Sequence, residues 1–164
     1  MDCTFLIDEG KFNIRVCALV LHAGRLLLGR CEGDPYWHTV GGRLKTGETL
    51  KIGVKRECRE ETGVSLRAER LAVLSENFFT LHGTAFHELA FYYWMETPPD
   101  PAAIPSEFCE DGVREELRWS PLKALPQAPV LPPFLQSLNW TDTDWPLHVV
   151  LRQEEGTTIC EPLR

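Results

Sequence analysis

Three glutamates, Glu57, Glu60 and Glu61, lie close together in the stretch 57–61. On a helix that turns about 100° per residue, Glu57 and Glu61 continue the line that Leu50 and Val54 begin, so an apolar stripe turns acidic. Carboxylates at this spacing repel one another, and burying one beside a core is costly unless it is paired or binds a cation. The pattern therefore indicates a divalent cation held by oxygen ligands, which suits Mg²⁺ or Mn²⁺ better than Zn²⁺.

A solvated helix face is the usual explanation of an acidic cluster. Here it fits poorly, because two of the acids stand where the amphipathic period asks for apolar side chains. The neighbouring Arg56 can offset one negative charge, and a bound cation would offset the rest. We therefore favour the cation site over the solvated face.

The acidic stretch needs a helix to position it, and the flanking residues define where that helix begins and ends. Thr49 or Thr46 can cap it, and the run 50–62 is rich in good helix formers. Gly63 is typical of the left-handed residue that follows a helix. Before the helix, the pair Gly41-Gly42 marks a sharp bend in the chain.

Strands are expected on both sides of this helix, because branched and aromatic residues are concentrated there. The sequence predicts them over 12–21, 25–30, 64–79, 85–96, 115–119 and 147–151. The first two should form a hairpin through a short turn that ends at Gly24. Most of the twelve prolines fall between Pro98 and Pro133, so loop and short helices are expected there, one of them capped by Ser120.

Composition favours one globular domain spanning residues 1–164, with its core at about 10–125 and a proline-rich, partly helical C-terminal extension. Hydrophobic residues make up 43 % of the chain and charged residues 25 %. The formal charge of −7 disfavours nucleic acid and anionic membranes as partners. A phosphate-bearing substrate would therefore have to meet local arginines or a bound cation.

Two further expectations concern location and cysteine chemistry. The chain has neither a leader-like opening nor an apolar run of membrane-spanning length, so we expect a cytoplasmic protein. Its six cysteines contain no C-x-x-C pair, and its histidines show no metal-ligand spacing. We therefore expect reduced thiols, without a zinc site or a disulfide framework.

The segment 42–64 resembles the Nudix box, the signature of the Nudix hydrolases. The fixed positions that match are Gly42, Glu48, Arg56, Glu57, Glu60, Glu61 and Gly63. Two residues depart from the usual pattern: Cys58 stands where the family has an aliphatic residue, and Val40 stands where many members have proline. A buried thiol behaves as a small hydrophobe, and Val40 leaves the backbone groups of the bend in place, so we expect little consequence from either.

This resemblance implies the α/β Nudix fold, an α/β/α sandwich with a mixed β-sheet, and a hydrolase that uses Mg²⁺, with Mn²⁺ as a substitute. In such an enzyme Glu57 and Glu61 would bind the cations together with the backbone carbonyl of Gly41. Glu60 would complete the cluster or contact a bridging water. Glu57 is the first candidate for the general base, although family members differ in this role. One of the two glutamates at 115–116 could supply a further acid, or both could be exposed charges.

The remaining motif residues would have positioning roles. Arg56 would orient the carboxylates, and Glu48 would brace the glycine loop against the helix. Gly42 and Gly63 would be structural.

Residues outside the motif are candidates for substrate binding. Arg15 and Arg30 could hold phosphate oxygens through bidentate contacts, although a surface ion pair is the commoner role of a strand arginine. Trp37 could stack on a base, with core packing as the alternative. In the strand 85–96, alternation places neighbouring side chains on opposite faces, and we assign Glu88 to the substrate side.

The resemblance implies hydrolysis of a phosphoanhydride bond in a nucleoside diphosphate linked to another group. Candidate substrates are ADP-ribose, nucleotide sugars and nucleoside triphosphates, oxidised ones included, followed by dinucleoside polyphosphates. The alternative is a catalytically silent module that senses a nucleotide, and the intact acidic triad argues against it. An RNA-end enzyme is disfavoured by the acidic balance. A homodimer is compatible with the family, but the sequence identifies no interface.

Overall fold

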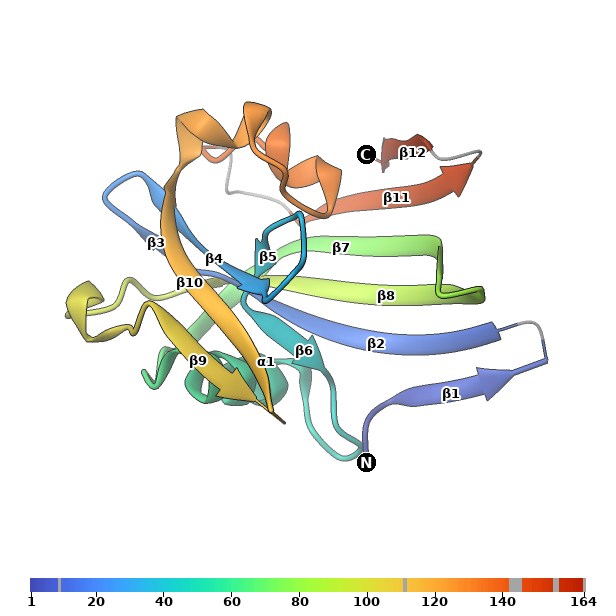
Figure 1. Ribbon diagram of the computed structural model, residues 1–164, viewed down its shortest axis with the longest axis horizontal. Coiled ribbons are helices and arrows are strands. Elements are labelled where there is room, and N and C mark those ends of the chain that lie inside the picture. Colours follow the sequence, from blue (N-terminus) through green and yellow to red (C-terminus); the bar gives the residue numbers. More distant parts are fainter. Residues whose placement is uncertain (9, 111, 142–145, 155–156, 164) are drawn as a thin grey trace.

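The computed structural model describes residues 1–8, 10–110, 112–141, 146–154 and 157–163, which form two β-sheets and one α-helix (Figure 1). The larger sheet has the order β1-β2-β8-β7-β11-β12, with β6 paired to β2. Its strands are β1 Thr4–Ile7, β2 Gly10–Leu19, β6 Gly41–Arg43, β7 Ala68–Leu81, β8 Thr84–Met95, β11 Leu147–Glu154 and β12 Thr157–Leu163. Strands β2 and β8 are parallel, as are β7 and β11, while the other pairs are antiparallel, so the predicted mixed sheet is confirmed.

The smaller sheet has the order β3-β4-β10-β9, with β5 paired to β4. Its strands are β3 Leu21–His22, β4 Arg25–Cys31, β5 His38–Thr39, β9 Glu107–Glu110 and β10 Val113–Pro121. The predicted hairpin between 12–21 and 25–30 is confirmed only next to its turn, where β3 pairs with β4, because β2 belongs to the other sheet. Both edges of β2 are already occupied, one by β8 and the other by β1 and β6. Beyond Leu19 the chain pairs with β4 instead: Val20 accepts a hydrogen bond from the Leu27 N–H at 3.0 Å, and the short β3 follows.

Helix α1, Leu50–Thr62, has the predicted bounds. Thr49 is the cap, since its hydroxyl accepts a hydrogen bond from the Ile52 N–H at 3.3 Å. Gly63 follows in the left-handed conformation, with φ of 72°, and its N–H donates to the Arg59 carbonyl at 2.9 Å. In the described ranges, no helix is long and apolar enough to cross a bilayer.

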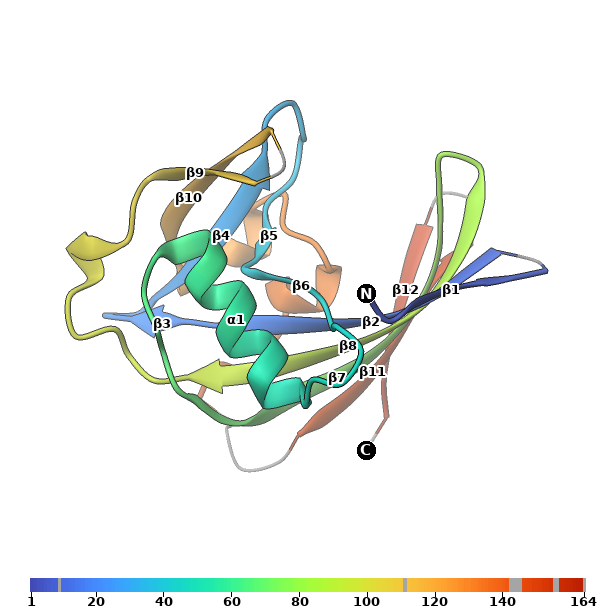
Figure 2. The same cartoon turned by 90° about the horizontal axis from the view of Figure 1, so that it is seen from below.

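The side chains of β2 alternate between two cores. Val16 and Ala18 belong to the core under α1, whereas Cys17 and Leu19 belong to the core on the opposite face of the sheet. Short 3₁₀ helices cover that second face (Figure 2). They are part of a set of three, η1 Pro101–Ala103, η2 Leu122–Gln127 and η3 Pro133–Gln136. The sandwich is thus the predicted one, with 3₁₀ turns as its second helical layer.

Proline explains why the described residues of this second layer form short 3₁₀ turns and no long helix, since proline lacks the N–H that a continuing helix requires. Pro126 lies inside η2, and Pro133 begins η3. The expected helix cap at Ser120 is wrong. That residue belongs to β10, and η2 begins at Leu122 without a side-chain cap.

Candidate active site

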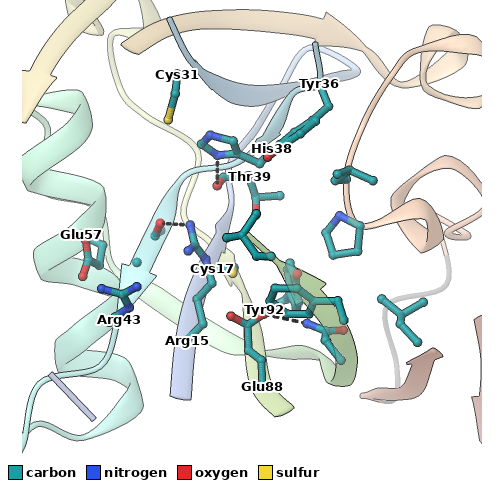
Figure 3. Close-up of a pocket in the computed structure, with 18 of the residues that line it drawn as sticks. Arg15, Cys17, Cys31, Tyr36, His38, Thr39, Arg43, Glu57, Glu88 and Tyr92 are labelled. Carbon is teal, nitrogen blue, oxygen red and sulfur yellow. Dashed lines mark hydrogen bonds between the residues drawn. The ribbon is translucent and has the colours of Figure 1, made fainter. Parts of the chain in front are cut away.

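A cleft of about 810 Å³ opens beside the larger sheet, and both sheets contribute to its walls (Figure 3). The carboxyl half of α1 and the glycine bend before it form one wall. Apolar side chains from the end of β7 and from the loop at 131–133 line another part. The cleft therefore joins a charged region to an apolar one, as a nucleotide with its phosphates and base requires.

Arg56 is the centre of the charged wall. Its Nε and Nη2 atoms donate to both carboxylate oxygens of Glu48, at 2.7 and 2.9 Å. Its Nη1 atom donates to Glu57 at 2.7 Å and to Glu60 at 2.9 Å. The hydrogen bonds from Arg56 lower the pKa of Glu48 to about 2. Arg56 is thus placed to orient the helix carboxylates, and Glu48 ties the preceding loop to the helix through Arg56.

Glu61 is the most buried of the three helix glutamates, with only 4 % of its surface exposed. Its Oε1 atom accepts a hydrogen bond from the Gly41 N–H at 2.9 Å, whereas its buried Oε2 atom has no hydrogen-bond partner. Burial raises the pKa of Glu61 well above its ordinary value. A buried carboxylate oxygen without a partner on a cleft wall is the feature that a cation would satisfy.

Two glycines allow the backbone to approach this carboxylate wall. Gly41 has a φ of 144°, and a Cβ atom there would lie 2.2 Å from the Val16 carbonyl oxygen. A Cβ atom on Gly42 would lie 2.6 Å from Oε2 of Glu57. The Gly41 carbonyl accepts from Nη2 of Arg15 at 2.6 Å, and a carbonyl oxygen has a second lone pair to offer.

These groups fit a hard divalent cation, but the three helix glutamates do not contribute equally, as the sequence had suggested they would. The oxygens of the three helix glutamates do not come within 4.8 Å of one another as a set. Glu60 is 40 % exposed and lies on the rim, because Arg56 and Lys45 hold it there. The oxygen donors best placed for a cation are therefore Glu61, Glu57 and the Gly41 carbonyl.

Of the predicted substrate residues, Arg15 and Glu88 line the cleft. Glu88 accepts hydrogen bonds from the side-chain amides of Asn13 and Asn77, both at 2.8 Å. Sequence reasoning missed these asparagines. Strand register is the signal that could have found them, since Glu88 lies directly opposite Asn13 on β2 and Asn77 on β7.

Trp37 and Arg30 do not line the cleft. Trp37 is 5 % exposed and belongs to the core. The guanidinium of Arg30 lies 4.5 Å from its ring centre and that of Arg118 lies 3.8 Å from it, while Arg30 also pairs with Glu116 at 2.8 Å. The structure therefore gives no support to substrate contacts by these two residues. Of the glutamates at 115–116, Glu115 faces the cleft.

An acidic helix, a glycine bend and an arginine lie beside one cleft, an arrangement suited to phosphate-bearing small molecules. Residues 11–141 match the family model of the NUDIX domain, and the chain belongs to this family. Members of the Nudix hydrolase family generally use divalent metal and act on small nucleotide substrates.

Curated relatives match over parts of their length. The oxidized purine nucleoside triphosphate hydrolase of Mus musculus is 45 % identical over 51 residues, which are 29 % of this chain and 33 % of that protein. Putative nudix hydrolase 1 of Caenorhabditis elegans is 31 % identical over 83 residues, which are 48 % of this chain and 21 % of that protein. The matches thus span about a third and about a fifth of these relatives.

Solved structures show the same fold over most of the chain. A MutT protein from Bacillus halodurans has a TM-score of 0.66 at 15 % identity, covering 91 % of this chain and 97 % of its own. A MutT protein from Methanosarcina mazei Go1 has a TM-score of 0.56 at 24 % identity, covering 80 % and 92 %. At these identities the likeness concerns the fold alone.

Proposed function

We propose that this enzyme hydrolyses a phosphoanhydride bond of a nucleoside triphosphate, with Mg²⁺ as its cation and Mn²⁺ as a substitute. The observation that carries the proposal is the buried Oε2 atom of Glu61, which has no hydrogen-bond partner on a wall of the cleft. The Gly41 N–H donates to the other oxygen of Glu61, and the Glu57 carboxylate lies against Gly42, so the glycine bend contacts both glutamates.

Each residue of the charged wall has a task in this proposal. Glu57 and Glu61 hold the cation with the Gly41 carbonyl, while Arg56 keeps Glu57 oriented through its 2.7 Å hydrogen bond. When bound, the cation polarises a phosphoryl oxygen and activates water. Glu57 is the proposed acceptor of the proton of the attacking water.

Basic side chains of the cleft would hold the phosphates. Arg15, Arg43 and Lys45 all line the cleft, and they supply local positive charge in a chain whose formal charge is −7. Arg15 is fixed by its hydrogen bond to the Gly41 carbonyl, so its guanidinium is preorganised next to the cation ligands. These groups spread the negative charge of the transferring phosphoryl group.

The apolar part of the cleft would receive the base. Phe78, Phe79 and Leu131 line it, and Glu88 with Asn77 adds hydrogen-bonding groups near them. The 51-residue similarity to an oxidized purine nucleoside triphosphate hydrolase supports oxidised purine nucleotides as the first class to test. ADP-ribose and nucleotide sugars follow.

A substrate panel tests the proposal. Purified protein is incubated with oxidised and unoxidised purine nucleoside triphosphates, ADP-ribose, nucleotide sugars and dinucleoside polyphosphates, with and without Mg²⁺, and the released phosphates are measured. We expect Mg²⁺-dependent turnover, fastest on a nucleoside triphosphate, and a loss of about 10²–10⁴-fold in Glu57→Gln. Tight nucleotide binding without turnover on any compound would instead support the nucleotide-sensing alternative and overturn the proposal.

Two predictions from the sequence accompany this function. We expect the enzyme to act in the cytoplasm, and we keep the homodimer as a prediction. Size-exclusion chromatography with light scattering would measure the oligomeric state.

A further inference from the structure

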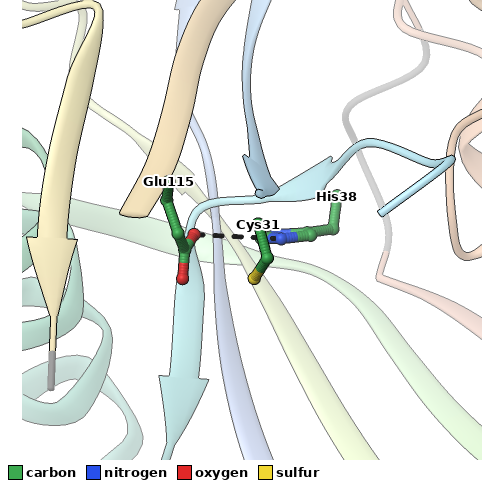
Figure 4. A group of neighbouring side chains, drawn as sticks. All are labelled: Cys31, His38 and Glu115. Carbon is green, nitrogen blue, oxygen red and sulfur yellow. Dashed lines mark ion pairs between the residues drawn. The ribbon is translucent and has the colours of Figure 1, made fainter. Parts of the chain in front are cut away.

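A second group of metal-binding side chains lies in the wall of the same cleft. Cys31, His38 and Glu115 each offer one ligand atom, and these atoms lie within 4.8 Å of one another (Figure 4). Within the described part of the chain, no other set of three cysteine, histidine or acidic residues meets this condition. All three residues line the cleft.

The register of the smaller sheet brings these residues to one face. Glu115 on β10 is the direct partner of Cys31 on β4, and His38 on β5 is the direct partner of Gly29. Because Gly29 and Cys31 are two residues apart on one strand, their positions share a face. Gly29 leaves the space that the ligands use, since a Cβ atom there would lie 3.3 Å from the His38 ring and 3.6 Å from Oε2 of Glu115.

The imidazole of His38 is oriented for metal binding. Its Nδ1 atom lies 3.2 Å from the Thr39 carbonyl oxygen, and because a carbonyl only accepts, Nδ1 carries the proton. The Nε2 lone pair then faces Glu115, whose Oε2 atom is 3.9 Å away. Burial, together with the charge of Arg15, lowers the pKa of His38.

Glu115 supplies the second observation that points to a ligand. Its Oε2 atom is buried and has no hydrogen-bond partner. This oxygen lies 3.9 Å from Nε2 of His38, beyond hydrogen-bond distance. A cation placed between them would satisfy both groups at once.

We propose that Cys31, His38 and Glu115 bind a thiophilic divalent cation such as Zn²⁺, at a site separate from the oxygen ligands of α1. A thiolate, an imidazole and a carboxylate form a donor set typical of zinc, and three protein ligands leave a fourth position open to the cleft. As the metal–sulfur bond forms, the Cys31 thiol releases its proton to the solvent. The sequence expectation of no zinc site missed this group because its ligands are distant in the chain and meet only through strand pairing.

Titration of the full-length, metal-free protein with Co²⁺ tests the site, because a thiolate ligand produces a near-ultraviolet charge-transfer band that carboxylates cannot produce. Zn²⁺ affinity is then measured by competition with a chromogenic chelator. We expect one equivalent of Co²⁺ to develop the band and one equivalent of Zn²⁺ to abolish it. Glu57→Gln should leave the band in place, which separates this site from the cation site on α1.

Ligand variants and a matched cysteine control complete the experiment. Cys31→Ser should remove the band. His38→Gln and Glu115→Gln should each weaken Zn²⁺ binding by about 100-fold, because the loss of a metal ligand should cost at least as much affinity as the loss of a residue that only supports a ligand. Cys109→Ser, which changes an exposed free cysteine, should leave both readings unchanged. Absence of the band in the wild type, or its persistence in Cys31→Ser, would overturn the proposal. The readings report binding and not hydrolysis, so they stand apart from the test of the enzymatic function.

Discussion

Replacing Glu48 by glutamine should weaken the fold in a pH-dependent way. Glu48 accepts two hydrogen bonds from Arg56 and a third, at 3.0 Å, from the Lys45 N–H. These contacts lower its pKa from the ordinary 4.5 to about 2, which corresponds to about 3 kcal/mol of stabilisation of the ionised form. Because 16 % of the side chain is exposed to solvent, we expect a measured loss of about 2 kcal/mol for Glu48→Gln at pH 7.

The sign of the pH effect follows from the direction of this shift. The pKa is lower in the folded state, so the stabilisation is complete above about pH 4.5 and is lost as the pH falls towards 2. Urea unfolding, followed by circular dichroism at several pH values, measures it. The curves of wild type and Glu48→Gln should converge as the pH falls through this range.

The matched control is Glu60→Gln, which changes another partner of Arg56. The Glu60 side chain is 40 % exposed, so its replacement should cost about 0.5 kcal/mol. A difference between wild type and Glu48→Gln that stays constant from pH 7 to pH 2 would refute the reasoning, as would equal losses in the two variants.

Two further predictions concern the glycine bend and the buried acid. Gly41→Ala should lower the free energy of unfolding in urea by about 3 kcal/mol, because its Cβ atom would meet the Val16 carbonyl. Gly47→Ala should lower it by about 1 kcal/mol, because Gly47 has a φ of 88° but open space around it. Equal losses in the two variants would contradict the steric explanation. Glu61→Gln should raise the melting temperature at pH 8 relative to wild type. Burial raises the pKa of Glu61, so ionisation of this carboxyl above its ordinary pKa opposes folding. The amide oxygen of the variant can still accept the hydrogen bond from the Gly41 N–H. A wild-type melting temperature that matches the variant at both pH 5 and pH 8 would contradict this second prediction.

Helix α1 could be predicted from local sequence because its determinants are local. Thr49, Gly63 and the apolar period through Val54 are read directly from neighbouring residues, and the structure places the bounds of the helix where they indicate. The burial of Glu57 and Glu61 follows from the same period. The strand-forming runs could also be predicted, since branched and aromatic residues favour strands whichever strand they pair with.

Which strands pair with one another could not be predicted from the sequence, because pairing depends on which strand edges are still free in the folded sheet. Strand β2 has neighbours on both edges, and this fact moves β4 into a second sheet. Edge strands such as β1 and β9 were not predicted either, because they lack the long apolar runs of buried strands. The grouping of Cys31, His38 and Glu115 depends on that second sheet, so no sequence spacing could indicate it.

The roles of single aromatic and basic side chains were the least predictable. Tyr36 and Trp37 are adjacent in sequence, yet Tyr36 lines the cleft while Trp37 packs in the core. Arg15 and Arg30 seemed equivalent as strand arginines, but Arg15 lies at the glycine bend and Arg30 pairs with Glu116. Each outcome is decided by the face of the strand or loop that a distant segment covers.

In the proposed function, Glu57 and Glu61 hold a hard cation that is required for phosphoanhydride hydrolysis. The most direct test is the rate of hydrolysis of one nucleoside triphosphate as a function of Mg²⁺ concentration, measured for the wild type, Glu57→Gln and Glu61→Gln. We expect the wild-type rate to rise from near zero to saturation, and both variants, folded by circular dichroism, to be slower by about 10²-fold or more at saturating Mg²⁺. A wild-type rate that is unchanged by a chelator, or variants as fast as the wild type, would contradict the claim.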